Sequence, residues 1–204
     1  MRLSKVCPPS SQILDLGCGT GEIAAAISQR GYQVTACDFA EEMIDIARSS
    51  HSGAGVKWVS LKPDWEVLPF GDASFDGIVA SSVFEYLVDV QRVAAELARV
   101  LRPDGVLLLT VPNPFSRVRK REAWLQSVLS NHRLSLMLRR IQWIAFYTSY
   151  LRISRNRFQG EQWESVLTAA DFAAFDRRDF SKDTWRKQAT APLILLTVKK
   201  VAKT

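Results

Sequence analysis

The chain has 204 residues, enough to bury the core of one domain and too few for a second domain of ordinary size. Hydrophobic residues make up 47% and charged residues 24%, which are the values of globular proteins and exclude a disordered or fibrous chain. The net charge of +6 is local, because ten Lys and Arg but only one acid, Glu122, lie from Arg117 to Arg157. The rest of the chain is slightly acidic.

The sequence lacks the patterns of secretion, membrane spanning and metal binding. Residues 1–12 contain no apolar run of the kind that forms a signal peptide, so we expect a cytoplasmic location. The uncharged stretch 141–151 is about half of the roughly 20 residues that a spanning helix needs. Three cysteines without CxxC spacing predict buried thiols, and we expect neither a disulfide framework nor a metal site.

The first 112 residues alternate between strand-like and helix-like segments. Short apolar runs predict strands at 12–16, 32–37, 56–60, 77–80 and 106–111. Helical spacing of apolar residues predicts helices at 22–30, 41–48 and 90–100, with Asp89 as the N-cap of the third and Gly31 closing the first. Strands that alternate with helices predict a doubly wound, mostly parallel α/β sheet.

The alternation stops after Pro112. Residues 115–158 form a basic, aromatic-rich insert, and the spacing predicts a helix from 161 to 170 and two strands, near 174–180 and 192–200. The two late strands raise the expected total to seven. We expect one domain over residues 1–204 with a helical insert after the fifth strand.

A glycine-rich segment between the first strand and the first helix carries the strongest chemical signal. Residues 13–21 read Ile-Leu-Asp-Leu-Gly-Cys-Gly-Thr-Gly, and glycines at such a turn allow positive φ angles and a close approach of ligand. Asp38 lies 23 residues after Asp15, at the end of the second strand, where a carboxylate can accept hydrogen bonds from ribose hydroxyls. This spacing predicts a ligand that contains adenosine. The alternatives are an Asp15 satisfied by backbone amides and an Asp38 that only caps a helix.

Charge favours one class of adenosine ligand. Asp15 and Glu22 flank the position where a dinucleotide places its pyrophosphate, and they would repel it. The same acids attract a sulfonium and an amino group. The glycine spacing also departs from GxGxxG, because residue 22 is Glu, and no phosphate-binding GxxxxGK[ST] occurs.

These segments resemble the class I S-adenosylmethionine (SAM) dependent methyltransferases, in their small-molecule branch. Residues 13–21 resemble the first SAM-binding motif, residues 34–47 the second, and residues 64–76 and 99–111 the later ones, in order along the chain. The resemblance implies SAM as cofactor, with the methionine end at the glycine loop, the ribose at Asp38 and the adenine at Asp64. The implied cofactor residues are Asp15, Gly17, Cys18, Gly19, Gly21, Asp38, Phe39, Met43, Asp64, Trp65 and Ser81.

The residues that act on the methyl acceptor are harder to predict than those that bind SAM. SAM carries an activated methyl group, so the enzyme can work without a base. Glu85 or Tyr86, after the fourth strand, could orient or deprotonate an acceptor, although a solvated loop acid and a half-buried aromatic ring are the alternatives. His132, in the insert, is a further candidate. The Asn-Pro-Pro-aromatic signature of nucleic-acid base methylation is absent after the fourth strand, which disfavours nucleic acid. We expect transfer to a small-molecule or lipid-like acceptor, with oxygen slightly favoured.

The basic insert stands where such enzymes elaborate a substrate lid. Leu134, Met137, Leu138, Ile141, Ile144 and Ala145 would share one face of a helix. An ordinary helical pair with a solvated basic side explains this as well as a lid does. The functional alternatives are contact with an anionic substrate or carrier, or with a membrane surface, and single-stranded RNA ranks lower. A binding module that keeps the fold and docks through the insert is the alternative to an enzyme. The oligomeric state is not predicted.

Overall fold

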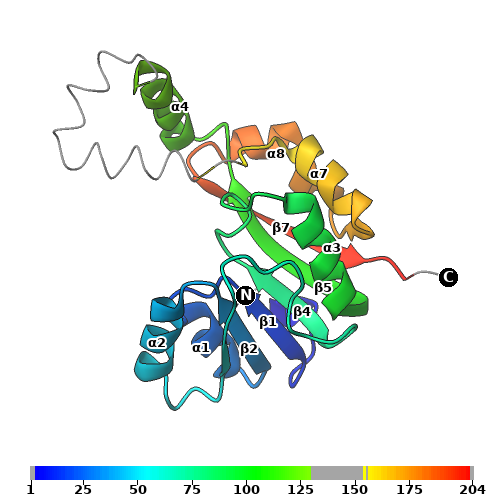
Figure 1. The fold of residues 1–204 in the computed structure, drawn as a ribbon. Coiled ribbons are helices and arrows are strands. Elements are labelled where there is room, and N and C mark those ends of the chain that lie inside the picture. Colours follow the sequence, from blue (N-terminus) through cyan, green and yellow to red (C-terminus); the bar gives the residue numbers. More distant parts are fainter. Residues whose placement is uncertain (1–2, 130–153, 155, 203–204) are drawn as a thin grey trace.

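The computed structural model describes residues 3–129, 154 and 156–202 as a seven-stranded mixed sheet with helices on both faces (Figure 1). The strands are β1 (Gln12–Leu16), β2 (Gln33–Asp38), β3 (Lys57–Ser60), β4 (Phe75–Ala80), β5 (Leu101–Pro112), β6 (Phe172–Ala174) and β7 (Leu193–Lys200). The helices are η1 (Leu3–Lys5), α1 (Glu22–Ser28), α2 (Glu41–Ser50), α3 (Val90–Val100), α4 (Arg117–Leu129), α7 (Gly160–Ala169), η2 (Arg177–Phe180) and α8 (Lys182–Lys187).

The strand order is β3-β2-β1-β4-β5-β7-β6. The first five strands pair in parallel, and β7 pairs antiparallel with both β5 and β6. From β1 the chain adds β2 and β3 on one side of the sheet and then β4 and β5 on the other, so the switch point of the strand order lies between β1 and β4. Ligands of open α/β sheets bind beside such a switch point, at the carboxyl ends of the strands. The α/β class and the seven mostly parallel strands predicted from the sequence are confirmed.

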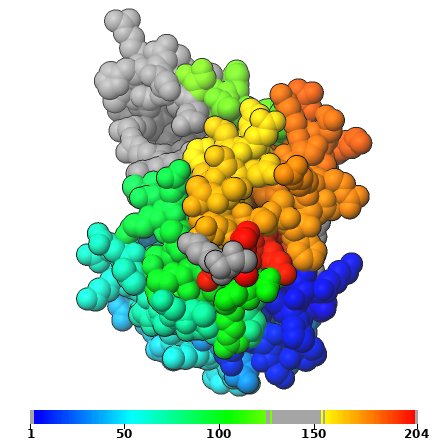
Figure 2. Space-filling view, turned by 90° about the vertical axis from the view of Figure 1, so that its right-hand side faces the viewer, coloured from blue at the N-terminus to red at the C-terminus, as the bar shows by residue number. Residues whose placement is uncertain are grey.

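The two faces of the sheet bury separate cores, because side chains alternate along each strand. One core joins Ile13, Val34 and Val106 to η1 and α1. The other joins Leu14, Ile78 and Leu107 to α3, α7 and α8. Figure 2 shows the second face, where α7 and α8, in yellow to orange, lie beside the green segments of the chain that include α3.

Local signals at the helix ends explain why the predicted boundaries hold. The side chain of Asp89 accepts a hydrogen bond from the Arg92 amide at 2.9 Å and caps α3, as expected. Gly31 has a φ of 85° and its amide bonds to Ser28, so it ends the turn after α1.

The segment 174–180 does not form the predicted strand. The strand β6 covers only Phe172–Ala174, and Arg177–Phe180 forms the 3-10 helix η2. Asp176 accepts a hydrogen bond from the Arg178 amide and starts η2, which an apolar alternation around Phe175 and Phe180 does not reveal. The expected sixth strand is therefore present, but it is shorter and lies earlier than predicted, and the bounds 174–180 were wrong.

Within the insert, the structure describes the first helix, α4, and the segment that leads into α7. The predicted apolar helix face from Leu134 to Ala145 lies outside the described residues. In the part of the chain that the structure describes, no helix is both long and apolar enough to cross a membrane.

Candidate functional site

The glycine loop, residues 17–21, connects the carboxyl end of β1 to α1 at the switch point of the sheet. Gly17 has a φ of 67°, and a Cβ placed on it would lie 2.4 Å from Cγ2 of Val83, in the loop that follows β4. Gly19 has a φ of 52°, and a Cβ on it would have no neighbour within 4 Å. One glycine therefore allows close packing, and the other leaves space above the loop for a ligand. Gly21 is the N-cap residue of α1.

Asp15 and Asp38 lie beneath and beside the glycine loop. Asp38 accepts hydrogen bonds from the Gly19 amide at 2.9 Å and from the Ala40 amide at 3.0 Å, so it braces the loop and is not a simple helix cap. Asp15 is only 1% exposed. Its Oδ2 has no hydrogen-bond partner among the described residues. A buried carboxylate oxygen without a partner is costly, and a bound amino group would satisfy it.

The buried position of Asp15 changes its acidity. Burial, and to a lesser extent the charge of Asp38, raises the pKa of Asp15 to about 7. The thiol of Cys18 is half-buried, and burial together with the charge of Asp15 raises its pKa to about 12. Cys18 therefore stays neutral near neutral pH. Asp15, in β1 directly before the glycine loop, and the glycine backbone together fit the positively charged methionine end of SAM.

The residues expected to surround adenosine follow the carboxyl ends of the neighbouring strands β2 and β3. Phe39, directly after β2, is 60% exposed, and Met43 in α2 is half-buried. Asp64 is exposed, and Trp65 packs partly on the core. An exposed aromatic ring, a thioether and an exposed carboxylate are side chains suited to an adenine ring and its amine. Their roles remain proposals.

The loop that carries Asp64 and Trp65 is fixed by two residues of α3 that sequence reasoning missed. Glu96 Oε2 accepts from the Leu68 amide at 2.9 Å. Arg99 donates to the carbonyls of Leu68 at 3.1 Å and Phe70 at 2.9 Å, and it pairs with Glu96 at 2.9 Å. Their spacing of three residues on one helix face is the signal that could have identified them as a pair.

The loop after β4, residues 81–88, faces the glycine loop through Val83. Ser81 lies half-buried at its start, with Oγ 3.5 Å from Oγ1 of Thr110 in β5. Ser82 has a φ of 56°, and its amide donates to the same Thr110 oxygen at 2.8 Å. Thr110 therefore holds a left-handed turn of the backbone directly after β4, which fixes where the rest of the loop lies.

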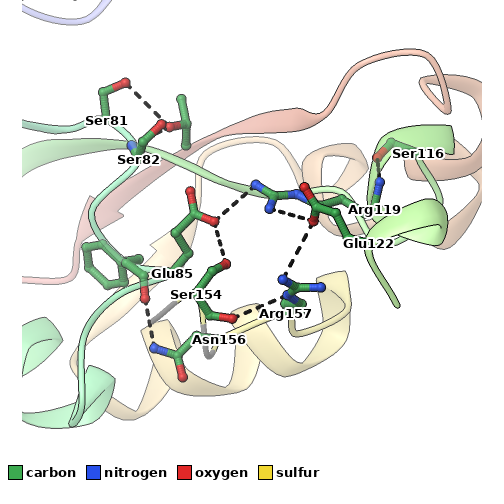
Figure 3. Close-up of polar contacts among 11 residues, drawn as sticks. Ser81, Ser82, Glu85, Ser116, Arg119, Glu122, Ser154, Asn156 and Arg157 are labelled. Atoms are coloured by element: carbon green, nitrogen blue, oxygen red, sulfur yellow. Dashed lines mark hydrogen bonds and ion pairs between the residues drawn. The ribbon is translucent and has the colours of Figure 1, made fainter. Parts of the chain in front are cut away.

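Glu85 does not point into solvent. It is 2% exposed, and its Oε2 accepts from Arg119 Nη2 at 3.0 Å and from Ser154 Oγ at 2.8 Å (Figure 3). The alternative of a solvated loop acid is therefore wrong.

Arg119 in turn pairs with Glu122 at 3.0 Å, and Arg157 lies 3.6 Å from Glu122. We call Glu85, Arg119, Glu122 and Arg157 the anchor network. Its charges cancel, as burial requires. Asn156 adds bonds to the backbone carbonyls of Phe84 and Leu87 at 2.8 and 2.7 Å.

The anchor network ties both ends of the insert to the loop after β4. Arg119 and Glu122 belong to α4, whereas Ser154, Asn156 and Arg157 precede α7. We therefore propose that Glu85 positions the insert beside the site, and its role in deprotonating an acceptor stays a prediction. Tyr86 is 37% exposed, so it remains accessible at the same loop. His132 lies outside the described residues.

Asn113-Pro114, after β5, has a structural role. Asn113 Nδ2 donates to the carbonyls of Gln188 at 3.0 Å and Ala191 at 3.2 Å, and its Oδ1 accepts from the Phe115 amide at 3.0 Å. These bonds fix the turn that leads into α4.

Taken together, the switch-point position, the glycine loop and the acids at the ends of β1 and β2 define a Rossmann-like domain for an adenosine cofactor with a cationic end. A family model described as "Methyltransferase domain" matches residues 14–109. A demethylmenaquinone methyltransferase of Clavibacter sepedonicus is 31% identical over 176 residues, which cover 83% of this chain and 69% of that protein. The chain belongs to the class I SAM-dependent methyltransferase family, whose cofactor is SAM.

Two further similarities bear on the extent of the match. A malonyl-[acyl-carrier protein] O-methyltransferase of Serratia marcescens is 37% identical over 118 residues, covering 58% of this chain and 45% of that protein. The structure of a SAM-dependent methyltransferase from Methanosarcina mazei aligns with a TM-score of 0.66 at 18% identity, over 99% of this chain and 98% of that one, and shows a shared fold. The chain spans between about a fifth and a half of the length of the first curated relatives.

Proposed function

We propose that this chain transfers a methyl group from SAM to a small-molecule acceptor, with an oxygen favoured as the accepting atom. The observation that carries the proposal is the buried Asp15 Oδ2, which has no partner among the described residues and belongs to the strand that leads into the glycine loop. A dinucleotide would bring phosphate charge to this carboxylate, whereas SAM would bring an amino group and a sulfonium.

The residues present fit SAM. Asp15 and the backbone of the glycine loop would hold its methionine end, Asp38 its ribose, and Phe39, Met43, Asp64 and Trp65 its adenine. The remaining proposed contacts are Gly17, Cys18, Gly19, Gly21 and Ser81. When bound, SAM supplies a methyl group on a positively charged sulfur, which an aligned nucleophile can attack directly. The contribution of the protein is then to orient the acceptor and to keep water away from it.

The state of Glu85 favours an acceptor that needs no deprotonation. Glu85 is the one carboxylate in the described loop 81–88, and Arg119 and Ser154 already hold its Oε2. A carboxylate or phenolate oxygen that is ionised near neutral pH can attack without a base. The name of the Serratia relative specifies O-methylation of malonyl-[acyl-carrier protein], and that of the Clavibacter relative specifies demethylmenaquinone. Both a carrier-linked acid and a lipid-like ring are therefore candidate acceptors.

Calorimetry with SAM and S-adenosylhomocysteine tests the cofactor. We expect binding by the purified chain that Asp38→Ala weakens at least tenfold, because the variant loses the brace of Gly19 and the ribose acceptor. Asp45→Asn changes an exposed acid of α2 and serves as the matched control. Absence of binding, or equal affinities of the Asp38 and Asp45 variants, would contradict the proposal.

Mass spectrometry of a metabolite extract incubated with methyl-labelled SAM tests the acceptor. We expect a labelled product whose fragments place the methyl group on oxygen. A label on carbon would move the assignment to C-methylation. Cofactor binding without label in any extract, including one that contains acyl-carrier proteins, would favour a binding module over an enzyme.

A further inference from the structure

One face of α4 gathers exposed cations around an exposed tryptophan. Arg117, Lys120, Arg121 and Trp124 follow the i, i+3, i+4, i+7 spacing that places side chains on one side of a helix. All four are exposed, and Trp124 is 65% exposed. We call these four residues the α4 basic face. Val118, 47% exposed, adds apolar surface on the same helix.

The charge of the α4 basic face is not balanced locally. Glu122, the only acid of α4, lies buried on the other side of the helix, where Arg119 and Arg157 neutralise it. In the described ranges, no ion pair involves Arg117, Lys120 or Arg121. The helix therefore separates its charges, with a neutral buried network inside and three uncompensated cations outside.

The place of α4 in the molecule favours a broad anionic surface over a shaped protein partner. Figure 1 shows α4 at one end of the molecule, beyond the sheet and away from α1 and α2. A helix face is convex, and a protein partner needs a complementary area of about 800 Å² on each side. Lipid headgroups need no such complementarity. Tryptophan also prefers the boundary between headgroups and hydrocarbon, where its ring is apolar and its N–H meets water.

We propose that the α4 basic face docks the protein on a membrane that contains anionic lipids, with Trp124 at the headgroup boundary. The docking is electrostatic with a single aromatic anchor, so it is reversible and sensitive to salt. Because the anchor network joins α4 to the loop after β4, a docked α4 would stay linked directly to the loop that faces the glycine loop. The docking itself does not rest on the proposed methyl transfer and would hold for a chain that only binds SAM.

Co-sedimentation of the full chain with vesicles tests the proposal. We expect recovery with vesicles of phosphatidylcholine and phosphatidylglycerol, little with phosphatidylcholine alone, and a steady loss as ionic strength rises. The triple variant Arg117→Gln, Lys120→Gln, Arg121→Gln should lower the partition coefficient by roughly a hundredfold, since each basic residue near such a surface contributes about fivefold. Trp124→Ala should weaken binding with the salt dependence retained.

The triple variant Lys5→Gln, Arg30→Gln, Lys57→Gln removes the same charge from exposed positions outside α4 and should bind vesicles as the wild type does. Thermal unfolding of both triple variants verifies that they fold. Equal recovery with neutral and anionic vesicles, or equal losses in the two triple variants, would overturn the proposal. Tighter binding to poly(U) RNA than to anionic vesicles at the same ionic strength would overturn it as well.

Discussion

Three properties of Asp15 determine how this carboxyl group responds to pH. It is buried, its Oδ2 has no hydrogen-bond partner among the described residues, and its pKa is raised to about 7, first by burial and then by Asp38. A carboxyl with a raised pKa keeps its proton in the folded state at a pH where the unfolded chain has lost it. The free energy of unfolding therefore depends on pH through this residue.

The sign of that dependence is fixed. Below about pH 4, Asp15 is protonated in both states. Between pH 4 and 7 only the unfolded chain ionises, so stability falls as pH rises, by of the order of 4 kcal/mol in total. We expect Asp15→Asn to remove this loss, and urea unfolding of both proteins without cofactor from about pH 4 to about pH 8 measures the difference. A constant difference across this range would contradict the raised pKa.

Cofactor affinity should show the opposite dependence on pH. The amino group of SAM binds the ionised carboxyl, so below the pKa of about 7 the affinity should fall by up to tenfold for each unit of pH. Calorimetry with S-adenosylhomocysteine from about pH 8 to about pH 6 measures this slope. Asp15→Asn should bind weakly with little slope, and an unchanged slope in that variant would assign the titration to another group.

Glu85 acts through its neighbours. Glu85→Gln leaves Arg119 with less compensation in a buried position, and we expect a loss of about 3 kcal/mol in urea unfolding. The double variant Glu85→Gln, Arg119→Met should lose less than the sum of the single losses, because Glu122 and Arg157 remain as a neutral pair. The control Glu161→Gln, exposed in α7, should be neutral.

The same variant separates positioning from base catalysis. If Glu85 deprotonated the acceptor, Glu85→Gln would flatten the acidic limb of the pH–rate profile. We expect the profile to keep its shape, with a higher KM for the acceptor and an unchanged affinity for SAM.

At the scale of elements, the sequence predicts what depends on local patterns. The alternation of apolar runs and helical spacing locates β1 to β5 and α1 to α3, and Asp89 marks the start of α3. The predicted bounds 174–180 were wrong because Phe175 and Phe180 suggest the apolar pattern of a strand, whereas Asp176 starts η2. The anchor network could not be predicted, because Arg119 and Ser154 are 34 and 69 residues from Glu85. The one hint was Glu122, a lone acid among ten cations.

The glycine loop offers a prediction with an internal control. Gly19 and Gly31 both have positive φ angles and open space for a Cβ, but only Gly19 belongs to the loop. Alanine at either position should cost about 1 kcal/mol of stability through backbone strain. Only Gly19→Ala should lower the affinity for S-adenosylhomocysteine, by at least tenfold, in calorimetry. Equal affinities of the two variants would show that the space at Gly19 is not a ligand site.

At the scale of the whole molecule, the candidate site and the C-terminal strands share one core. Trp163 and Trp185, from the C-terminal third, lie in the same cluster as Leu14 and Leu16 of β1. β7 inserts between β5 and β6, so the sheet is complete only when the last described strand is in place. This supports the expectation of a single domain, and we expect a ligand at the glycine loop to stabilise strands far from it.

Hydrogen exchange measures that coupling directly. S-adenosylhomocysteine at about 100 times its Kd stabilises the folded state by about 2.7 kcal/mol. If the chain unfolds as one unit, the slowest amides of β1 and of β7 exchange only through global unfolding, and both should slow by the same factor of about 100. Slowing confined to β1 and β2 would mean that the C-terminal strands open separately. Because β7 pairs with β5 over seven residue positions and shares a core cluster with β1, we expect equal slowing.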